Sequence, residues 1–259
     1  MTGRLAFLLT LLMLAMLEQI WPANSENLAE HSAECRVAEN LIVPNFPLAQ
    51  VAHAIAAKQL NILVIGAGSS QLPGPNGGKN AYPARLQQAL ADKLPGVDIR
   101  LTTDAKSKRT AAEMVKVLPQ LVVSSKPALV VWQTGTADAI QAIDPDQFSQ
   151  ALGRGINIAR SAGADVVLVN PQYSPRTESM IALGTYAENM RWVALQHDVP
   201  IFDRYSVMQL WADLGTFDFN ATTKKLDIAE RVHDCIGRLL ADQVIIAAKE
   251  SEPQPEIGR

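Results

Sequence analysis

The chain has 259 residues, of which 48% are hydrophobic and 19% are charged. This is the composition of an ordinary globular protein, and the length is ample for one sizeable core. The formal net charge of −3 comes with no long basic run. We therefore do not expect nucleic-acid binding, because the chain lacks the run of basic residues that such binding requires.

Residues 1–25 have the pattern of a secretory signal peptide. A basic start, MTGR, precedes about thirteen apolar residues, LAFLLTLLMLAML, and small residues follow at Ala23-Asn24-Ser25. An uncleaved anchor is the alternative, but the apolar run is shorter than the roughly 20 residues that span a bilayer. We therefore expect a periplasmic or secreted protein with no membrane span after cleavage.

Two cysteines, Cys35 and Cys235, lie near the two ends of the expected mature chain. An exported protein meets an oxidising compartment, where such a pair can close into a disulfide. The bridge would constrain the unfolded chain by about 5 kcal/mol on the chain-entropy account. Two buried free thiols are the alternative. A metal site is not expected, because the two cysteines have no matched histidines.

Short, β-branched apolar runs alternate with amphipathic segments along the chain. The runs predict strands at 62–65, 97–101, 128–132, 165–169 and 199–202. The segments predict helices at 83–93, 110–123, 146–161, 185–196 and 228–248. This alternation predicts one α/β domain, residues 26–248, with a mainly parallel sheet and helices on both faces. The polar, proline-bearing residues 249–259 are expected to form a disordered tail.

The first predicted strand runs into an elbow, GAGSS at residues 66–70, where open α/β sheets bind ligands. A dinucleotide fingerprint is disfavoured because Gln71 takes the place of its third glycine and Asp104 lies too far downstream for the ribose partner. A Walker-type phosphate loop is disfavoured because no Gly-Lys-Ser/Thr ending follows. No cofactor is therefore expected.

Three stretches together resemble the SGNH (GDSL) hydrolase family. They are GAGSS at 66–70, WQTGTAD at 132–138 and the segment from Asp227 to Cys235. The resemblance covers nearly the whole mature chain and implies the SGNH fold, a flavodoxin-like three-layer α/β/α arrangement with a mainly parallel five-stranded sheet. It also implies acyl-transfer chemistry, in which a histidine and an aspartate activate a serine and amide groups stabilise the oxyanion.

The resemblance places the family's nucleophile position at Gly68, which has no hydroxyl group. Ser69 and Ser70 follow this position by one and two places. The serine that the family's chemistry requires is therefore absent from its usual place in the elbow.

The family's other catalytic positions also hold different residues in this chain. The oxyanion glycine position falls on Lys106 and the oxyanion asparagine on Ala137, whereas the neighbouring Asp138 is kept. Counting back eight places from the second cysteine puts Asp227 at the histidine position, with Lys224 at the triad aspartate. An aspartate is a poor neutral base at about pH 7. We expect these five residues and the three of the elbow to form a vestigial pocket.

A shifted triad of Ser69, Glu230 and His233 is the alternative arrangement. Glu230 and His233 have the spacing of an acidic residue followed by a histidine, and Ser69 is one residue from the nucleophile position. The register counted from Cys235 argues against it, because it puts His233 at a tyrosine position inside the helix. The leading hypothesis is an exported pseudoenzyme that binds a ligand or a partner. The alternatives are an active serine esterase or carbohydrate deacetylase, and a purely structural domain.

Basic residues flank the expected cleft. Lys106, Lys108 and Arg109 fall on one rim, and Lys224 and Lys225 fall on the other. One hypothesis is that the pocket binds an anionic small molecule or carbohydrate through these side chains and the elbow amides. The alternative is that they are ordinary solvated charges. No feature of the sequence indicates an oligomeric state.

Overall fold

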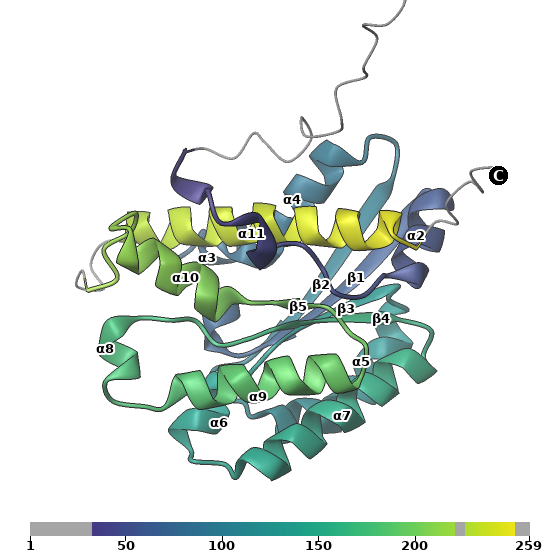
Figure 1. Ribbon diagram of the computed structural model, residues 1–259. Helices are drawn as coiled ribbons and strands as arrows, with labels where there is room; N and C mark the ends of the chain where they lie inside the picture. Colours follow the sequence, from purple (N-terminus) through teal and green to yellow (C-terminus); the bar gives the residue numbers. More distant parts are fainter. Residues whose placement is uncertain (1–32, 221–225, 252–259) are drawn as a thin grey trace, which may run out of the picture. The chain divides into compact units, whose positions relative to one another are not determined.

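The computed structural model describes residues 33–220 and 226–251 (Figure 1). The chain divides into two units, Met1–Glu30 and His31–Arg259, and only the second contains described residues. The expected signal peptide, Lys224, Lys225 and all but the first three residues of the expected tail lie outside the described residues. None of the described helices combines the length and the apolar content needed to cross a membrane.

Five parallel strands form the central sheet in the order β2-β1-β3-β4-β5. Their bounds are Gln59–Gly66 (β1), Asp98–Ala105 (β2), Leu129–Gln133 (β3), Asp165–Val169 (β4) and Ile201–Phe202 (β5). Almost every residue of β1, β3 and β4 is buried, because helices cover both faces of the sheet. The predicted flavodoxin-like α/β fold with a parallel five-stranded sheet is confirmed.

Two groups of long helices enclose this sheet (Figure 1). On one face lie α2 (Ala49–Ala56), α4 (Tyr82–Lys93) and α11 (Leu226–Lys249). On the other face lie α5 (Ala111–Ser125), α7 (Pro145–Ser161) and α9 (Leu183–Gln196). The shorter elements are η2 (Ala33–Cys35), η3 (Glu39–Leu41), η4 (Gly68–Ser70), α3 (Gly77–Asn80), α6 (Thr136–Ile140), α8 (Pro175–Glu178) and α10 (Arg204–Asp213). All five predicted helices are present, whereas α2 and α10 were not predicted.

Side-chain caps fix where two of these helices begin. Thr110 and Glu113 exchange hydrogen bonds with each other's backbone amides, so a capping box starts α5. At α10, Asp203 accepts a hydrogen bond from the Ser206 amide. Asn170, at the end of β4, accepts from the Tyr205 amide at 2.8 Å and holds α10 against the neighbouring strand. These contacts place the first residue of α10 at the carboxyl edge of the sheet.

A disulfide joins η2 to α11. Cys35 and Cys235 are 200 residues apart in sequence, and their Cα atoms lie 5.0 Å apart. Both residues are buried. The predicted bridge is confirmed, and it ties the start of the described chain to its last helix.

Candidate functional site

The elbow η4 directs Ser70 back into the protein. Its Oγ donates to Gln133 Oε1 at 2.9 Å and lies 3.0 Å from the Tyr82 hydroxyl. The same Gln133 oxygen accepts from the Ala67 amide at 3.1 Å. Because an amide oxygen only accepts, the single proton of Ser70 goes to Gln133, and Tyr82 is the donor to Ser70. Ser70 is therefore committed to a buried network and is not available for attack on a substrate.

Gly68, which the sequence predicts to occupy the family's nucleophile position, faces a different serine. A β-carbon built on Gly68 would lie 2.9 Å from Ser107 Oγ, in the turn after β2. Any side chain at position 68 would therefore require Ser107 to move. In the same turn the Lys106 amide donates to Gly66 O at 3.0 Å. This amide extends the β1–β2 ladder and is not free to stabilise an oxyanion.

The stretch after β3 contributes packing and anchoring. Ala137 is buried in α6 and has no side-chain donor at the asparagine position. Asp138 is 1% exposed, and its carboxylate accepts from the Ala111 amide at 3.0 Å and from Thr134 Oγ1 at 3.2 Å. Burial raises the pKa of Asp138. This aspartate joins the loop after β3 to the start of α5.

The structure does not bring Ser69, Glu230 and His233 into a hydrogen-bonded triad. Ser69 Oγ is buried with no hydrogen-bond partner among the described residues. Glu230 accepts from Asn80 Nδ2 at 2.8 Å, and His233 Nδ1 accepts from the Tyr82 amide at 2.9 Å. Burial, followed by the nearby positive charge of an arginine, lowers the pKa of His233 to about 3. Its imidazole is therefore neutral and weakly basic.

Three residues of the expected cationic rim, Lys106, Lys108 and Arg109, lie among the described residues. Arg109 is buried and makes two hydrogen bonds, of 2.8 and 3.2 Å, to the carboxylate of Asp104. The hydrogen bond from Arg109 is the main cause that lowers the pKa of Asp104. Lys106 and Lys108 are exposed, as is Asp227 at the start of α11. The charge of Arg109 is therefore balanced by Asp104 within the protein, and its role toward a ligand stays a prediction.

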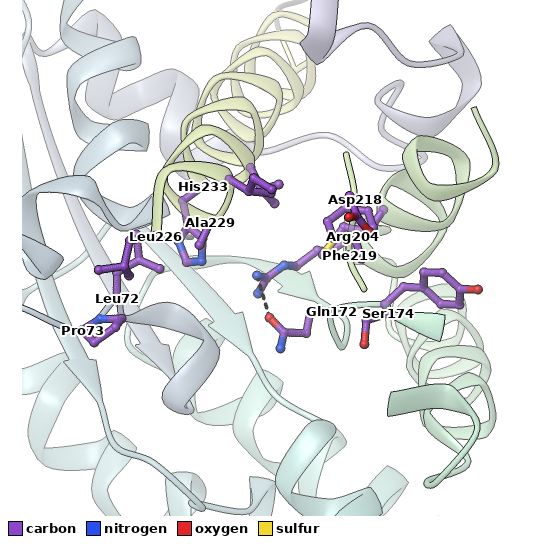
Figure 2. Close-up of a pocket in the computed structure, with 14 residues that line it drawn as sticks. Leu72, Pro73, Gln172, Ser174, Arg204, Asp218, Phe219, Leu226, Ala229 and His233 are labelled. Atoms are coloured by element: carbon purple, nitrogen blue, oxygen red, sulfur yellow. Dashed lines mark hydrogen bonds between the residues drawn. The ribbon is translucent and has the colours of Figure 1, made fainter. Parts of the chain in front are cut away.

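A pocket of about 320 Å³ opens beside the elbow (Figure 2). It is built by the segments that follow β1, β4 and β5, together with α11. This is the carboxyl edge of the sheet, where open α/β folds bind ligands. Its apolar lining comes mainly from Leu72, Met208, Phe219, Ile228 and Val232. Its polar lining includes Gln172, Ser174, Arg204, Asp218 and His233.

Arg204 is the cationic residue among the residues that line this pocket, and it is fully buried. Its Nη2 donates to Gln172 Oε1 at 3.2 Å (Figure 2). Its Nη1 donates to Ser69 O at 3.1 Å. Its Nε is buried without a hydrogen-bond partner, and no carboxylate of the described residues forms an ion pair with it. Burial lowers the pKa of Arg204 to about 10, so the side chain remains cationic near neutral pH.

Sequence reasoning missed Arg204, Gln172 and Tyr82. The available signal for the first two was their position directly after predicted strands, at the carboxyl edge of the sheet. Tyr82 gave no such signal, because it opens a helix of ordinary amphipathic pattern. Across residues 33–220 and 226–251, no three His, Cys, Asp or Glu side chains are grouped so as to hold a metal ion.

Two curated proteins similar to this chain are named as esterases. Esterase TesA of Pseudomonas aeruginosa is 37% identical over 99 residues, which are 37% of this chain and 48% of that protein. An arylesterase of Vibrio mimicus is 27% identical over 106 residues, which are 39% of this chain and 52% of that protein. The chain thus matches about half the length of these curated relatives.

Solved structures share the fold over most of the described chain. The crystal structure of TesA superposes with a TM-score of 0.56 at 25% identity, covering 74% of this chain and 99% of that chain. A lipase/acylhydrolase from Enterococcus faecalis superposes with a TM-score of 0.58 at 17% identity, covering 76% and 100%. The predicted SGNH hydrolase fold is confirmed. Residues 34–250 match the model of the Non-GDSL lipase-like family, and the chain belongs to that family.

Proposed function

We propose that this protein is a non-hydrolytic SGNH-fold protein that binds a ligand in the pocket beside the elbow. The observation that supports this is the position of Gly68 against Ser107, with the Lys106 amide bonded to Gly66. On this proposal, the site has no nucleophile at Gly68, and the Lys106 amide that would stabilise the oxyanion is already hydrogen-bonded to Gly66.

The magnitude of these losses favours binding over turnover. Loss of a single triad member typically lowers kcat by about 10⁴- to 10⁶-fold. Loss of one oxyanion donor lowers kcat by about 10²- to 10³-fold more. Ala137 provides no side-chain donor, and His233 is engaged by the Tyr82 amide. A site that lacks all of these groups retains only its ability to bind.

The alternative is an active serine esterase or carbohydrate deacetylase with a rearranged site. This alternative is supported by the names of the two curated relatives, an esterase and an arylesterase. Ser69 would be its nucleophile, because the other elbow serine is committed to Gln133. The buried, unpartnered Ser69 Oγ is the observation that this alternative would use.

We further propose that the protein works outside the cytoplasm, in the periplasm or beyond. The disulfide between Cys35 and Cys235 supports this location. Such bridges form and persist in oxidising compartments and are rare in reducing ones.

An esterase assay on the disulfide-bonded protein, purified from the periplasm, tests the proposed function. Turnover of p-nitrophenyl acetate and butyrate is measured for the wild type and for Ser69→Ala, and labelling by a fluorophosphonate probe is measured in parallel. We expect both proteins to show only the background hydrolysis of the buffer, and neither to be labelled. Turnover or labelling that Ser69→Ala abolishes would overturn the proposal in favour of a rearranged esterase. A known SGNH esterase serves as the positive control for both readouts.

A further inference from the structure

We propose that Arg204 is the ligand-binding cation of the pocket, and that its ligand is an amphipathic molecule with an oxyanion head, carboxylate or phosphate, on an apolar chain. This inference rests on the proposed function in taking the pocket as a binding site.

The first step of the argument is the unbalanced charge of Arg204. It is 0% exposed, yet it donates hydrogen bonds only to neutral oxygens of the described residues, one from the Ser69 backbone and one from the Gln172 amide. Burying a charge is costly unless it is paired. The described residues provide no carboxylate for it, whereas Arg109 and Arg191 are each paired with an aspartate. An anion from outside would complete the Arg204 site.

The second step is the geometry of the guanidinium edge. The Nε–H and one Nη2–H bond of an arginine point in the same direction and together match the two oxygens of a carboxylate or phosphate. In Arg204 this edge is only half used, because Nη2 donates to Gln172 Oε1 at 3.2 Å and Nε has no partner among the described residues. Nη1, on the other side, is held by Ser69 O and keeps the group oriented.

Gln172 is the side chain that the ligand head would replace. It follows β4, lines the pocket and is only partly buried, so it can turn away from Arg204 without disturbing the core. Its amide has the shape of a carboxylate but lacks the charge. The structure therefore holds a neutral substitute at the position where an oxyanion would bind most strongly.

The rest of the pocket sets the chemistry of the ligand body. Leu72, Phe219 and Val232 line it with apolar surface, and the volume of about 320 Å³ is at the low end for small-molecule pockets. His233 adds no charge, because its Nδ1 accepts from the Tyr82 amide and its proton is therefore on Nε2. Asp218, the carboxylate of this lining, is exposed and accepts from the Asn220 amide. A short apolar chain suits this space.

Calorimetric titration with four probes tests the chemistry of the head group. Octanoate, octyl phosphate and 1-octanol share one chain and differ in their heads, whereas acetate has the head without the chain. We expect saturable binding of octanoate or octyl phosphate, at least about tenfold weaker binding of 1-octanol, and none of acetate, since one charged contact is worth about this factor or more. The tighter of the two anions identifies the head. Binding of 1-octanol as tight as both anions, or no binding of either anion, would overturn the inference.

Gln172→Glu tests the role of Arg204 without removing it. The new carboxylate would pair with the buried guanidinium, so we expect anion affinity to fall at least about tenfold and the Tm to rise by about 2–4 °C. Gln150→Glu makes the same change of charge at an exposed position of α7 and should alter neither value. Gln172→Ala should bind the anion at least as tightly as the wild type. Wild-type anion affinity in Gln172→Glu would contradict the inference.

The two proposals can fail separately. Ester turnover that depends on Ser69, together with anion binding that Gln172→Glu abolishes, would overturn only the non-hydrolytic proposal, and the anion would then be a product bound at Arg204. Absence of both turnover and anion binding would overturn only the assignment of Arg204.

Discussion

Ser70 Oγ donates a 2.9 Å hydrogen bond to Gln133 Oε1 and thereby joins the elbow after β1 to the end of the neighbouring strand β3. The Tyr82 hydroxyl and the Ala67 amide complete this buried network. A serine beside the family's nucleophile position thus stabilises the fold of the elbow. The buried hydroxyl group of Ser70 therefore has a structural role.

Gly66→Ala should strongly destabilise the protein through this network. A β-carbon at position 66 would lie 2.2 Å from Ser70 Oγ and 3.4 Å from Gln133 Oε1. We expect the free energy of unfolding to fall by about 2–4 kcal/mol, from overpacking and from buried polar groups that lose their partners. Urea denaturation followed by circular dichroism measures the change.

Gly78→Ala is the matched control for this substitution. Its β-carbon would meet no atom within 4 Å, and the residue is exposed in the short helix α3. We expect no loss of stability, and a gain of up to about 1 kcal/mol from helix propensity. Equal effects of the two variants would contradict the steric argument for Gly66.

Acidification should destabilise the protein through His233. Burial lowers its pKa from 6.5 to about 3, so between these values the unfolded chain binds a proton that the folded protein excludes. The stability contributed by the neutral imidazole is complete above about pH 6.5 and is lost as the pH falls toward about 3. The slope for one such proton is at most about 1.4 kcal/mol per pH unit.

His233→Asn tests this pH dependence, because asparagine retains an acceptor for the Tyr82 amide and does not titrate. The free energy of unfolding should vary less with pH in this variant than in the wild type between pH 6.5 and 5, by urea denaturation at each pH. His53→Asn, at an exposed position of α2, is the matched histidine substitution for comparison. An unchanged slope in His233→Asn would show that another group is responsible.

The fold was predictable because its signals are local. The β-branched runs and helical periods mark β1 to β4 and the five long helices. The spacing of Thr110 and Glu113, near the start of α5, is that of a capping box. The helix α10 was missed because it is held mainly by distant contacts. Its first turn depends on Asp203, which also pairs with Arg191, and on Asn170 of the preceding strand loop.

The candidate site was only partly predictable for the same physical reason. The register of one motif predicts Gly68 at the nucleophile position, and this assignment stays a prediction. The relation of Gly68 to Ser107 could not be predicted, because β1 and β2 bring the two turns together only in the sheet. The burial of Arg204 could not be predicted either, since an arginine at the start of a helix is usually solvated. Its burial follows from packing of α10 beneath the elbow.

Asp138 should affect stability through its buried charge. Burial raises its pKa above 3.8 although it accepts hydrogen bonds from the Ala111 amide and Thr134. The contribution of protonated Asp138 to the free energy of unfolding is fully present below about pH 3.8. It is lost as the pH rises through the raised pKa of Asp138. Relative to the wild type, Asp138→Asn should therefore become more stable as the pH rises from 3 to 6, measured by urea denaturation.

Asp138→Ala is the companion variant, because it removes the acceptor as well as the charge. It leaves the Ala111 amide without its partner at the start of α5, and we expect a loss of about 1–3 kcal/mol at all pH values in this range. If Asp138→Asn were as damaging as Asp138→Ala at pH 6, the negative charge itself would be required.

Removal of the disulfide should cost substantial stability. The bridge closes a loop with a sequence separation of 200 residues, so its loss frees the unfolded chain from a long-range constraint. We expect Cys35→Ala/Cys235→Ala to lower the free energy of unfolding by about 2–5 kcal/mol. Treatment with a phosphine reductant should lower the stability of the wild type toward that of the double variant and leave the double variant unchanged. A double variant as stable as the oxidised wild type would mean that packing of η2 on α11 is sufficient to hold the two segments together.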